Sequence, residues 1–81
     1  MSSTVKKKKI DYVALDSSFM RIKGVHIETA RDLLDLGFHE WYQLKGRSPD
    51  VLFEDLKRLK KDVRQDRLKG LMIVVEYAET H

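Results

Sequence analysis

Apolar side chains recur at helical spacing along much of the chain, and the clearest case lies in its first half. Residues 27–36 place four apolar side chains on one helix face and charged side chains outside it. The apolar members are Ile27, Ala30, Leu33 and Leu34. We expect a helix over about 27–36, ended by Gly37 in a left-handed conformation. Asp32 and Asp35 fall on its outer face, where carboxylates are normally solvated.

The residues around this helix predict shorter elements. The stretch IDYVAL, residues 10–15, fits either a short extended segment or a single helical turn. Side-chain oxygens that could cap a short helix after it belong to Asp16, Ser17 and Ser18. That helix would lead into a turn at Gly24 and carry three apolar side chains, Phe19, Met20 and Ile22. A brief helix around 40–44 would then bury Trp41 and Leu44.

A second segment repeats the pattern of the first. LKGRSPDVLFEDL, residues 44–56, aligns with IKGVHIETARDLL, residues 22–34, at an offset of twenty-two residues. Ser48 is a good N-cap, and Pro49 suits the first helical position, where a missing N–H costs nothing. We therefore expect two related hairpins in series. Their aligned pairs include Lys23 with Lys45, Gly24 with Gly46, and Glu28 with Asp50.

The last segment, DVRQDRLKGLMIVVEYAE, is open to two interpretations. Asp62 could cap a helix whose inner face would hold Leu68, Leu71, Met72, Val75 and Ala78. However, the residues from Leu71 to Val75 are all apolar and follow Gly70, and a short buried strand fits that run nearly as well. We favour the helix, because the surroundings are helical and no partner strand is evident.

Together these elements predict one small all-α domain of about five short helices around a single core. The domain would span residues 10–81, after a disordered basic tail at residues 1–9. The predicted core residues come from every element: Phe19, Ile22, Val25, Ala30, Leu33, Leu34, Trp41, Leu44, Leu52, Leu56, Leu68 and Met72.

Residues 22–38 have the order typical of a helix-hairpin-helix, a motif that holds a nucleic-acid phosphate. An apolar residue and the glycine of the Lys23-Gly24 turn are followed by an alanine, leucines and a closing glycine. Free N–H groups at the helix start and the helix dipole favour an anion, and glycine lets it approach without a Cβ. His26 stands where such hairpins usually have a second glycine, and Glu28 where a lysine is common. His26 could itself bond the phosphate, whereas Glu28 would repel it. The hairpin could therefore either contact a phosphate directly or serve only as a structural scaffold. The candidate contacts are Lys23, Gly24, Val25, His26 and Thr29.

Two further surfaces could meet phosphates. The second turn is more basic than the first, although its glycine could serve only to end the preceding helix; it offers Lys45, Gly46, Arg47 and Ser48. A run of cations before the last helix is either a solvated face or a third contact, and it supplies Lys57, Lys60, Lys61 and Arg64. Convergence of the three surfaces would form a strip that tracks phosphates.

Charge changes this picture only at the N-terminus. The formal net charge is +3, yet the run Lys6 to Lys9 is positive throughout, and residues 10–81 carry a net charge of −1. The lysine run either adds sequence-independent attraction to phosphates or is a solvated arm. The chain has no cysteine, no apolar run of membrane-spanning length and no signal-peptide pattern. We therefore expect a cytoplasmic protein without membrane contact.

The sequence gives little support for an enzyme, a metal site or a cofactor. The histidines are His26, His39 and His81; none are spaced as i, i+4 zinc ligands, and no cysteine could complete a site. No serine, histidine and aspartate are placed as nucleophile and base. Three aromatic residues are expected in the core rather than as a platform for stacking bases: Phe38, Trp41 and Tyr42.

Three blocks in this order resemble the small bacterial pathogenicity-locus family of helix-hairpin-helix proteins, some of which are labelled mitomycin-resistance proteins. The blocks are IKGVHIETARDLLDLGF, LKGRSPDVLFEDL, and VRQDR followed by an apolar helix that ends in YAE. The resemblance covers roughly the last three quarters of the chain. It implies a compact all-α fold of two helix-hairpin-helix-like (SAM-like) units and an association with nucleic acid, with no established reaction. The cysteine and arginine that members often carry in the last helix are missing, so any role that rests on them does not transfer.

We therefore expect a non-enzymatic protein that binds DNA or another nucleic acid weakly and without sequence preference, through phosphates. The alternative is a protein-protein interaction module that keeps the fold but has lost DNA binding, since folds of this size serve both uses. The apolar run Leu71 to Val75, with Tyr77 beyond it, also predicts a weak homodimer through the last helix. In a monomer, the IDYVAL segment would cover that run instead.

Overall fold

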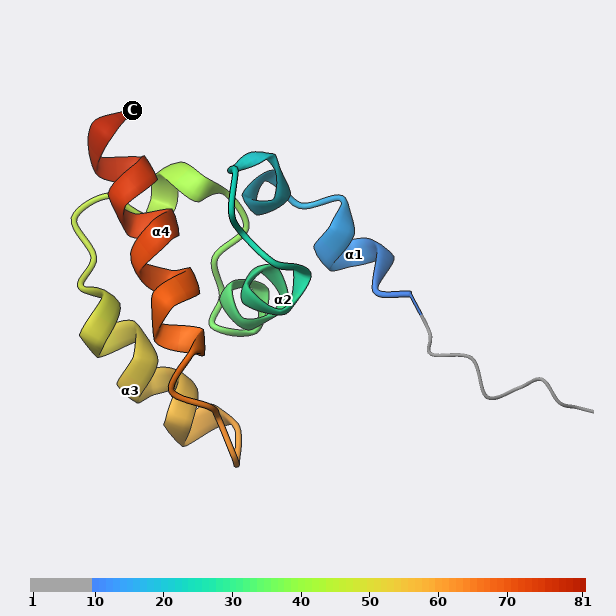
Figure 1. Ribbon diagram of the computed structural model, residues 1–81, viewed down its shortest axis with the longest axis vertical. Helices are drawn as coiled ribbons and strands as arrows, with labels where there is room; N and C mark the ends of the chain where they lie inside the picture. The colour runs from blue at the N-terminus through green and yellow to red at the C-terminus, as the bar shows by residue number, and fades with distance from the viewer. Residues whose placement is uncertain (1–9) are drawn as a thin grey trace, which may run out of the picture.

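The computed structural model describes residues 10–81, and the predicted basic tail at residues 1–9 lies outside that range. The described chain is all-helical, as expected, with four α-helices and two short 3-10 helices (Figure 1). In chain order they are α1 (Tyr12–Leu15), η2 (Ser18–Arg21), α2 (Ile27–Asp35), η3 (Trp41–Leu44), α3 (Pro49–Leu59) and α4 (Arg67–Thr80).

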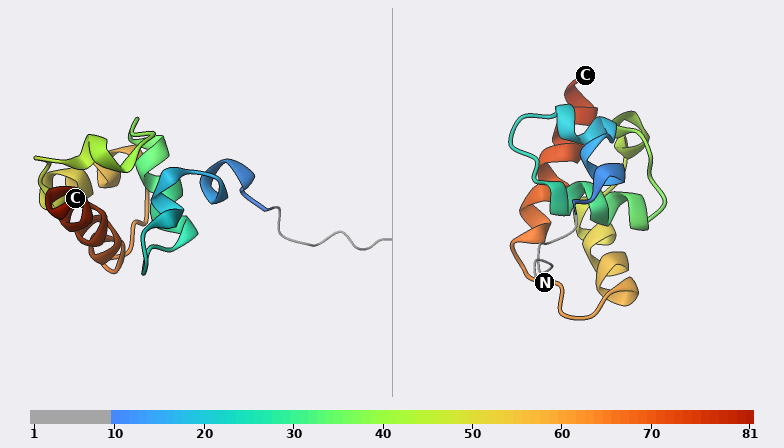
Figure 2. Two further views of the ribbon diagram at one scale, coloured as in Figure 1. Left: turned by 90° about the horizontal axis from the view of Figure 1, so that it is seen from above. Right: turned by 90° about the vertical axis from the view of Figure 1, so that its right-hand side faces the viewer.

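Helix α4 is the element against which most of the fold packs. It contacts η3, α3 and α2, and Figures 1 and 2 show it running beside α3. The apolar run from Leu71 to Val75 belongs to this helix, so the strand alternative is wrong. Its buried residues are Leu71, Val74, Val75 and Ala78. Coverage by three elements explains how a helix with apolar residues on several sides is accommodated.

Helices α2 and α4 approach each other closely at Thr29 and Gly70. A Cβ added to Gly70 would lie 3.0 Å from both Cβ and Cγ2 of Thr29, and closer still to its hydroxyl oxygen. Carbon atoms in favourable contact are about 3.5–4.0 Å apart. Thr29 is itself buried. The helix crossing therefore depends on a residue without a side chain at position 70.

The two aligned segments adopt the same turn. In each, the residue after the glycine donates its backbone N–H to the carbonyl oxygen of the residue before the lysine: Val25 to Ile22 at 3.2 Å, and Arg47 to Leu44 at 3.0 Å. Gly24 and Gly46 have φ angles of 91° and 81°, a region that other residues resist. Helices α2 and α3 begin at Ile27 and Pro49, which preserves the twenty-two-residue offset of the sequence repeat.

Helix boundaries follow the sequence where capping residues are clear. Helix α2 ends at Asp35, and Gly37 after it has a φ of 101°, as the left-handed end requires. Ser48 caps α3 by accepting from the N–H of Val51, with Pro49 at the first helical position. The short helices expected before Gly24 and around 40–44 are the 3-10 helices η2 and η3.

Helix α4 begins later than predicted. It starts at Arg67 after Asp66, so the prediction that Asp62 caps it is wrong. Asp62 has a φ of 54°, whereas an N-cap residue normally has an extended backbone. Helix α4 is therefore preceded by a loop that bends at Asp62, between α3 and Asp66.

The core contains most of the predicted residues, but its edge differs. Leu34, Trp41 and Leu68 are only partly buried and pack against the core from outside. Met72 is 51% exposed, so its assignment to the core is wrong, and Val74 of the same helix is buried instead. Buried as predicted are Phe19, Ile22, Val25, Ala30, Leu33, Leu44, Leu52 and Leu56.

The IDYVAL segment forms the helical turn α1 rather than an extended strand. It packs mainly against α2, on the side away from α4, as Figures 1 and 2 show. The prediction that it could cover the apolar run of the last helix is therefore wrong. Ala14 is buried against the core, but its neighbours are largely exposed: Ile10 at 57%, Tyr12 at 63%, Val13 at 66% and Leu15 at 45%.

Candidate nucleic-acid interface

The first turn presents a row of backbone N–H groups at the start of α2. His26 is the N-cap residue, and its side chain makes no capping hydrogen bond. Within residues 10–81, no acceptor meets the backbone N–H of Gly24, His26, Ile27 or Glu28. Unmet N–H groups at a helix start carry partial positive charge and favour an anion. These groups form the candidate site of the first turn.

A pocket of about 220 Å³ adjoins these groups, between the first turns of α2 and α4. Its lining includes Gly24, His26, Arg67, Lys69 and Gly70. Two helix N-termini therefore border one hollow, and both dipoles favour negative charge there. Lys69, which the sequence had not singled out, brings a cation, whereas Glu28 and Asp66 bring carboxylates to the same rim.

The predicted contacts of the first turn differ in their access to a ligand. Lys23 and His26 are exposed and free to reach outward. Val25 is buried in the core and Thr29 lies against Gly70, so neither side chain faces open solvent. Within the described residues, Lys23 and Lys69 take part in no ion pair.

The second turn has the same backbone but fewer open donors, since only the N–H groups of Ser48 and Asp50 meet no acceptor within residues 10–81. The N–H of Gly46 donates to Oε2 of Glu79 at 2.5 Å. Pro49 has no N–H, and the hydroxyl of Ser48 accepts from Val51. Lys45 and Arg47 are exposed on either side of the glycine. The second turn is therefore flanked by cations but closed by a carboxylate of its own chain.

The predicted cationic run is largely paired with acids. Lys57 pairs with Glu54, and Arg64 lies 3.4 Å from Asp66. Lys60 points inward to Asp32 and Asp35, at 2.8 Å from each. Lys61 is exposed and forms no ion pair with any residue in the range 10–81. The run is therefore not a uniform basic surface.

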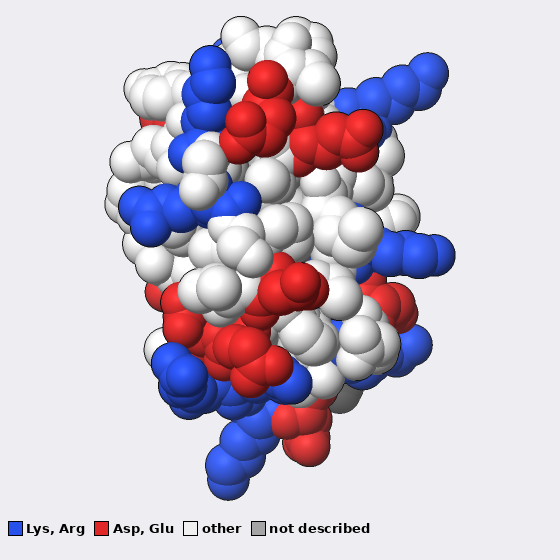
Figure 3. Space-filling model, turned by 90° about the vertical axis from the view of Figure 1, so that its left-hand side faces the viewer, with Lys and Arg blue, Asp and Glu red and all other residues white. Residues whose placement is uncertain are grey.

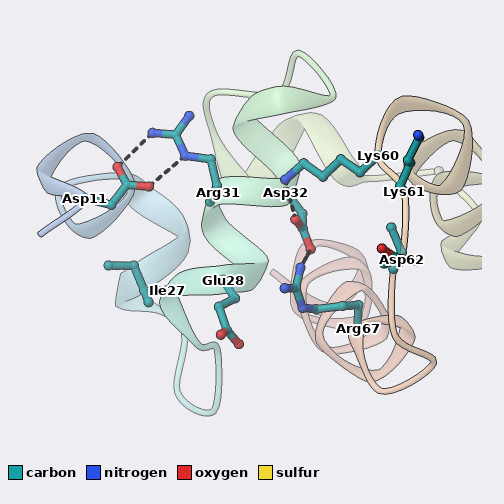
Figure 4. Close-up of a pocket in the computed structure, with 10 residues that line it drawn as sticks. Asp11, Ile27, Glu28, Arg31, Asp32, Lys60, Lys61, Asp62 and Arg67 are labelled. Atoms are coloured by element: carbon teal, nitrogen blue, oxygen red, sulfur yellow. Dashed lines mark hydrogen bonds and ion pairs between the residues drawn. The ribbon is translucent and has the colours of Figure 1, made fainter. Parts of the chain in front are cut away.

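Asp32 is buried, contrary to its predicted place on the solvated face of α2. Its side chain is 1% exposed and is held by Lys60 at 2.8 Å and by Arg67 at 2.5 Å (Figure 4). The helical wheel misplaced it because the two cations come from the end of α3 and the start of α4, which fold over this part of α2. The carboxylate therefore ties three helices together.

The ion pairs continue from Asp32 toward α1 through Arg31. Its guanidinium bonds both oxygens of Asp11, at 2.7 Å each, and reaches Asp35 at 3.0 Å. The hydrogen bond from Arg31, with one from the N–H of Ala14, lowers the pKa of Asp11 to about 2. Partial burial opposes ionisation of Asp35, but bonds from Lys60 and Arg31 outweigh it and lower the pKa of Asp35.

A second hollow of about 260 Å³ lies over this network, between α2 and the loop before α4 (Figure 4). Its cations include Arg31, Lys60 and Arg67, each already bonded to a carboxylate. Lys61 also lines the hollow and forms no ion pair within residues 10–81. The hollow is therefore mainly the outer surface of a structural network, with Lys61 as its one open cation among the described residues.

Positive and negative side chains alternate on the face that Figure 3 shows. Acidic side chains lie between the basic ones in several places, so no unbroken basic strip crosses this face. Any attraction to nucleic acid on this side must therefore come from local donors rather than from a broad field.

Aromatic side chains gather around the end of α4. The edge of Trp41 meets the ring of Tyr77 at a centroid distance of 5.0 Å, and Tyr77 stacks on His81 at 3.9 Å. Phe38 and Trp41 are partly buried against the core, broadly as expected. Tyr42 is 59% exposed, so its predicted burial is wrong.

The described residues offer no cluster of three or more His, Cys, Asp or Glu side chains that could hold a metal ion. No helix in the described part of the chain is both long and apolar enough to cross a membrane.

The family model for Cdd1, described as pathogenicity locus, matches residues 14–81. The chain belongs to the Cdd1 family. Searches among curated proteins and among solved structures found no significant match. For this Cdd1 chain the matched range includes both Lys-Gly turns, the buried Asp32 and all of α4. Residues 1–13, which include Asp11 and the start of α1, lie before it.

Proposed function

We propose that this protein binds DNA or another nucleic acid weakly and without sequence preference, through phosphates at its first Lys-Gly turn. The two turn-and-helix segments then act as two helix-hairpin-helix-like (SAM-like) units that share one core. The first unit is the contact, and the second supports it. The protein performs no reaction in this account.

The observation that carries the proposal is the difference between two turns of the same shape. The N–H groups of Gly24, Ile27 and Glu28 have no acceptor within residues 10–81. At the aligned place in the second turn, Gly46 already binds a carboxylate oxygen. A turn that accepts one anion in the second repeat has the geometry to accept another in the first.

Side chains around the first turn set the strength of this contact. Lys23 and Lys69 are exposed beside it and attract a phosphate. Glu28 is exposed in the first turn of α2 and opposes the phosphate. A charge at a helix end is worth about 0.3–1 kcal/mol. The opposing signs favour weak binding that responds to salt.

A protein-interaction module is the alternative, and the exposed apolar residues of α1 favour it. Ile10, Tyr12 and Val13 are each more than half exposed although they are large and apolar. A partner protein that covered them would bury apolar surface and depend little on salt, because few counterions would be released.

A residue-by-residue NMR titration with a short DNA duplex tests the proposal. We expect the largest amide shifts at Gly24, Ile27 and Glu28, and an affinity that falls steeply as salt rises because counterions are released. His26→Gly should leave the affinity equal or higher, because it removes a Cβ from the closest approach. A duplex affinity that does not change with salt concentration, or amide shifts confined to α1, would contradict the proposal and favour the interaction module.

A further inference from the structure

The last turn of α4 brings a carboxylate to the second Lys-Gly turn. Glu79 is exposed on the surface, and its Oε2 accepts from the N–H of Gly46, a residue 33 positions away in the chain. Lys45 has φ −61° and ψ 130°, and Gly46 has φ 81°, which are the angles of a type II turn. The turn's own hydrogen bond uses the N–H of Arg47, so the glycine N–H is left for an outside acceptor.

The surroundings of Gly46 favour an anion in that position. Lys45 and Arg47 are exposed on both sides, and neither forms an ion pair with another described residue. The guanidinium of Arg47 lies 5.2 Å from the centre of the Phe38 ring, which holds it near the turn. A carboxylate oxygen of Glu79 therefore accepts from the Gly46 N–H with a cation on each side. A phosphate oxygen in the same place would have the same donor and the same two cations.

The aligned position in the first repeat lacks such an occupant. Gly24 has the same left-handed backbone, but no acceptor within the described residues meets its N–H. Helix α4 passes both turns, and its Glu76 lines a hollow with Lys23 of the first turn. Glu76 is not hydrogen-bonded to Gly24, whereas Glu79 is bonded to Gly46. The two repeats therefore differ in that the glycine N–H of the second turn binds a carboxylate of the same chain, whereas that of the first turn does not.

We propose that the Gly46 turn is a second phosphate-binding site, kept closed by the carboxylate of Glu79. This inference rests on the proposed function for its natural ligand, a nucleic-acid phosphate, but the site can be tested with phosphate alone. A phosphate enters when the exposed Glu79 side chain rotates away, and Lys45 and Arg47 then face the phosphate instead of the carboxylate. Glu79 thus leaves the chain with one open phosphate contact, at the first turn.

The test compares Glu79→Ala with the matched variant Glu76→Ala, which removes the same charge from the same exposed helix end. Inorganic phosphate and a short duplex are titrated separately onto the wild type and both variants, and the Gly46 amide is followed by NMR. In Glu79→Ala the Gly46 amide should shift with phosphate. Duplex affinity should also exceed that of Glu76→Ala by about two- to fivefold, which corresponds to one helix-end charge.

Glu79→Gln provides a second check, since the amide oxygen can still accept from Gly46 while the charge is gone. It should lie between the wild type and Glu79→Ala in the phosphate shift at Gly46. A Gly46 amide that ignores phosphate in Glu79→Ala overturns the second site. If the duplex still shifts the Gly24 amide signal of that variant, the proposed function holds without the second site. If phosphate shifts Gly46 but no duplex binds, the site stands and the nucleic-acid function fails.

Discussion

Arg67 donates from Nη1 to Oδ2 of Asp32 at 2.5 Å, and the carboxylate it meets is almost completely buried. The pair joins the first turn of α4 to the middle of α2, beside the pocket that Gly24, His26 and Glu28 of the candidate site line. Lys60 holds the other carboxylate oxygen from the end of α3. The orientation of the first turn toward α4 therefore depends on a charge network as well as on apolar packing.

Asp32→Asn should lower the free energy of unfolding by about 2–4 kcal/mol, because it leaves Arg67 and Lys60 without a buried anion. The lower part of that range is expected, since both cations are partly exposed and Lys60 keeps Asp35. Urea denaturation measures the change. Asp55→Asn removes an exposed partner of Arg58 and should cost under about 0.5 kcal/mol. Equal costs for the two variants would show that Asp32 has no special role.

Gly70→Ala should destabilise the protein although alanine is the better helix former. The new Cβ would meet Thr29 at 3.0 Å or less, and overpacking of this kind costs about 1–3 kcal/mol. Helix propensity returns about 1 kcal/mol, so we expect a net loss of up to about 2 kcal/mol by thermal unfolding. Thr29→Ala combined with Gly70→Ala should lose less than the two single costs together. A Gly70→Ala variant that is more stable than the wild type would contradict the close crossing.

Leu33→Ala should cost more than Leu34→Ala. Leu33 is fully buried, whereas Leu34 is only partly buried at the core edge. A Leu→Ala change in a core costs about 2–5 kcal/mol, and we expect Leu33 within that range and Leu34 below about 2 kcal/mol. Chemical denaturation of both variants provides the comparison. The reverse order would mean that α2 is rotated relative to this structure.

Stability should fall as the pH drops from about 4 toward 2. The pKa of Asp11 is lowered from 3.8 to about 2, and the pKa of Asp35 is lowered as well. Carboxylates with lowered pKa values stabilise the fold above their unfolded pKa, and the contribution is lost as pH falls through the folded pKa. Arg31→Gln should flatten this part of the stability profile and raise the pKa of Asp11 toward 3.8, measured by NMR. An unchanged Asp11 pKa in that variant would refute the pairing.

The sequence predicted the helices and helix ends that are determined by residues close together in the chain. The apolar spacing of α2, the glycine after it, and the Ser48-Pro49 start of α3 each act within a few residues, so the sequence reveals them. The twenty-two-residue repeat likewise predicted both turns and both helix starts.

Contacts between distant residues could not be predicted in the same way. Asp32 meets Lys60 and Arg67 across 28 and 35 positions, and a helical wheel has no information about either. The closure of Gly46 by Glu79 spans 33 positions, so the sequence indicated that the second turn is the more basic one but not that it is closed. Met72 was misplaced because an apolar run on every side of α4 leaves the rotation of the helix undetermined.

The most direct measurement compares Glu28→Lys with Asp50→Lys in binding to one short duplex over a series of salt concentrations. Both acids are exposed at the second position of a helix, twenty-two residues apart, so the two variants change the charge equally. We predict that Glu28→Lys strengthens binding by up to about tenfold at low salt, and that the gain fades as salt rises. The reason is that Gly24 and Ile27 have open N–H groups, whereas at the aligned positions Gly46 is bonded to Glu79 and Pro49 has no N–H. Asp50→Lys should give a clearly smaller gain. Equal gains, or no gain from Glu28→Lys, would contradict a phosphate contact at the first turn.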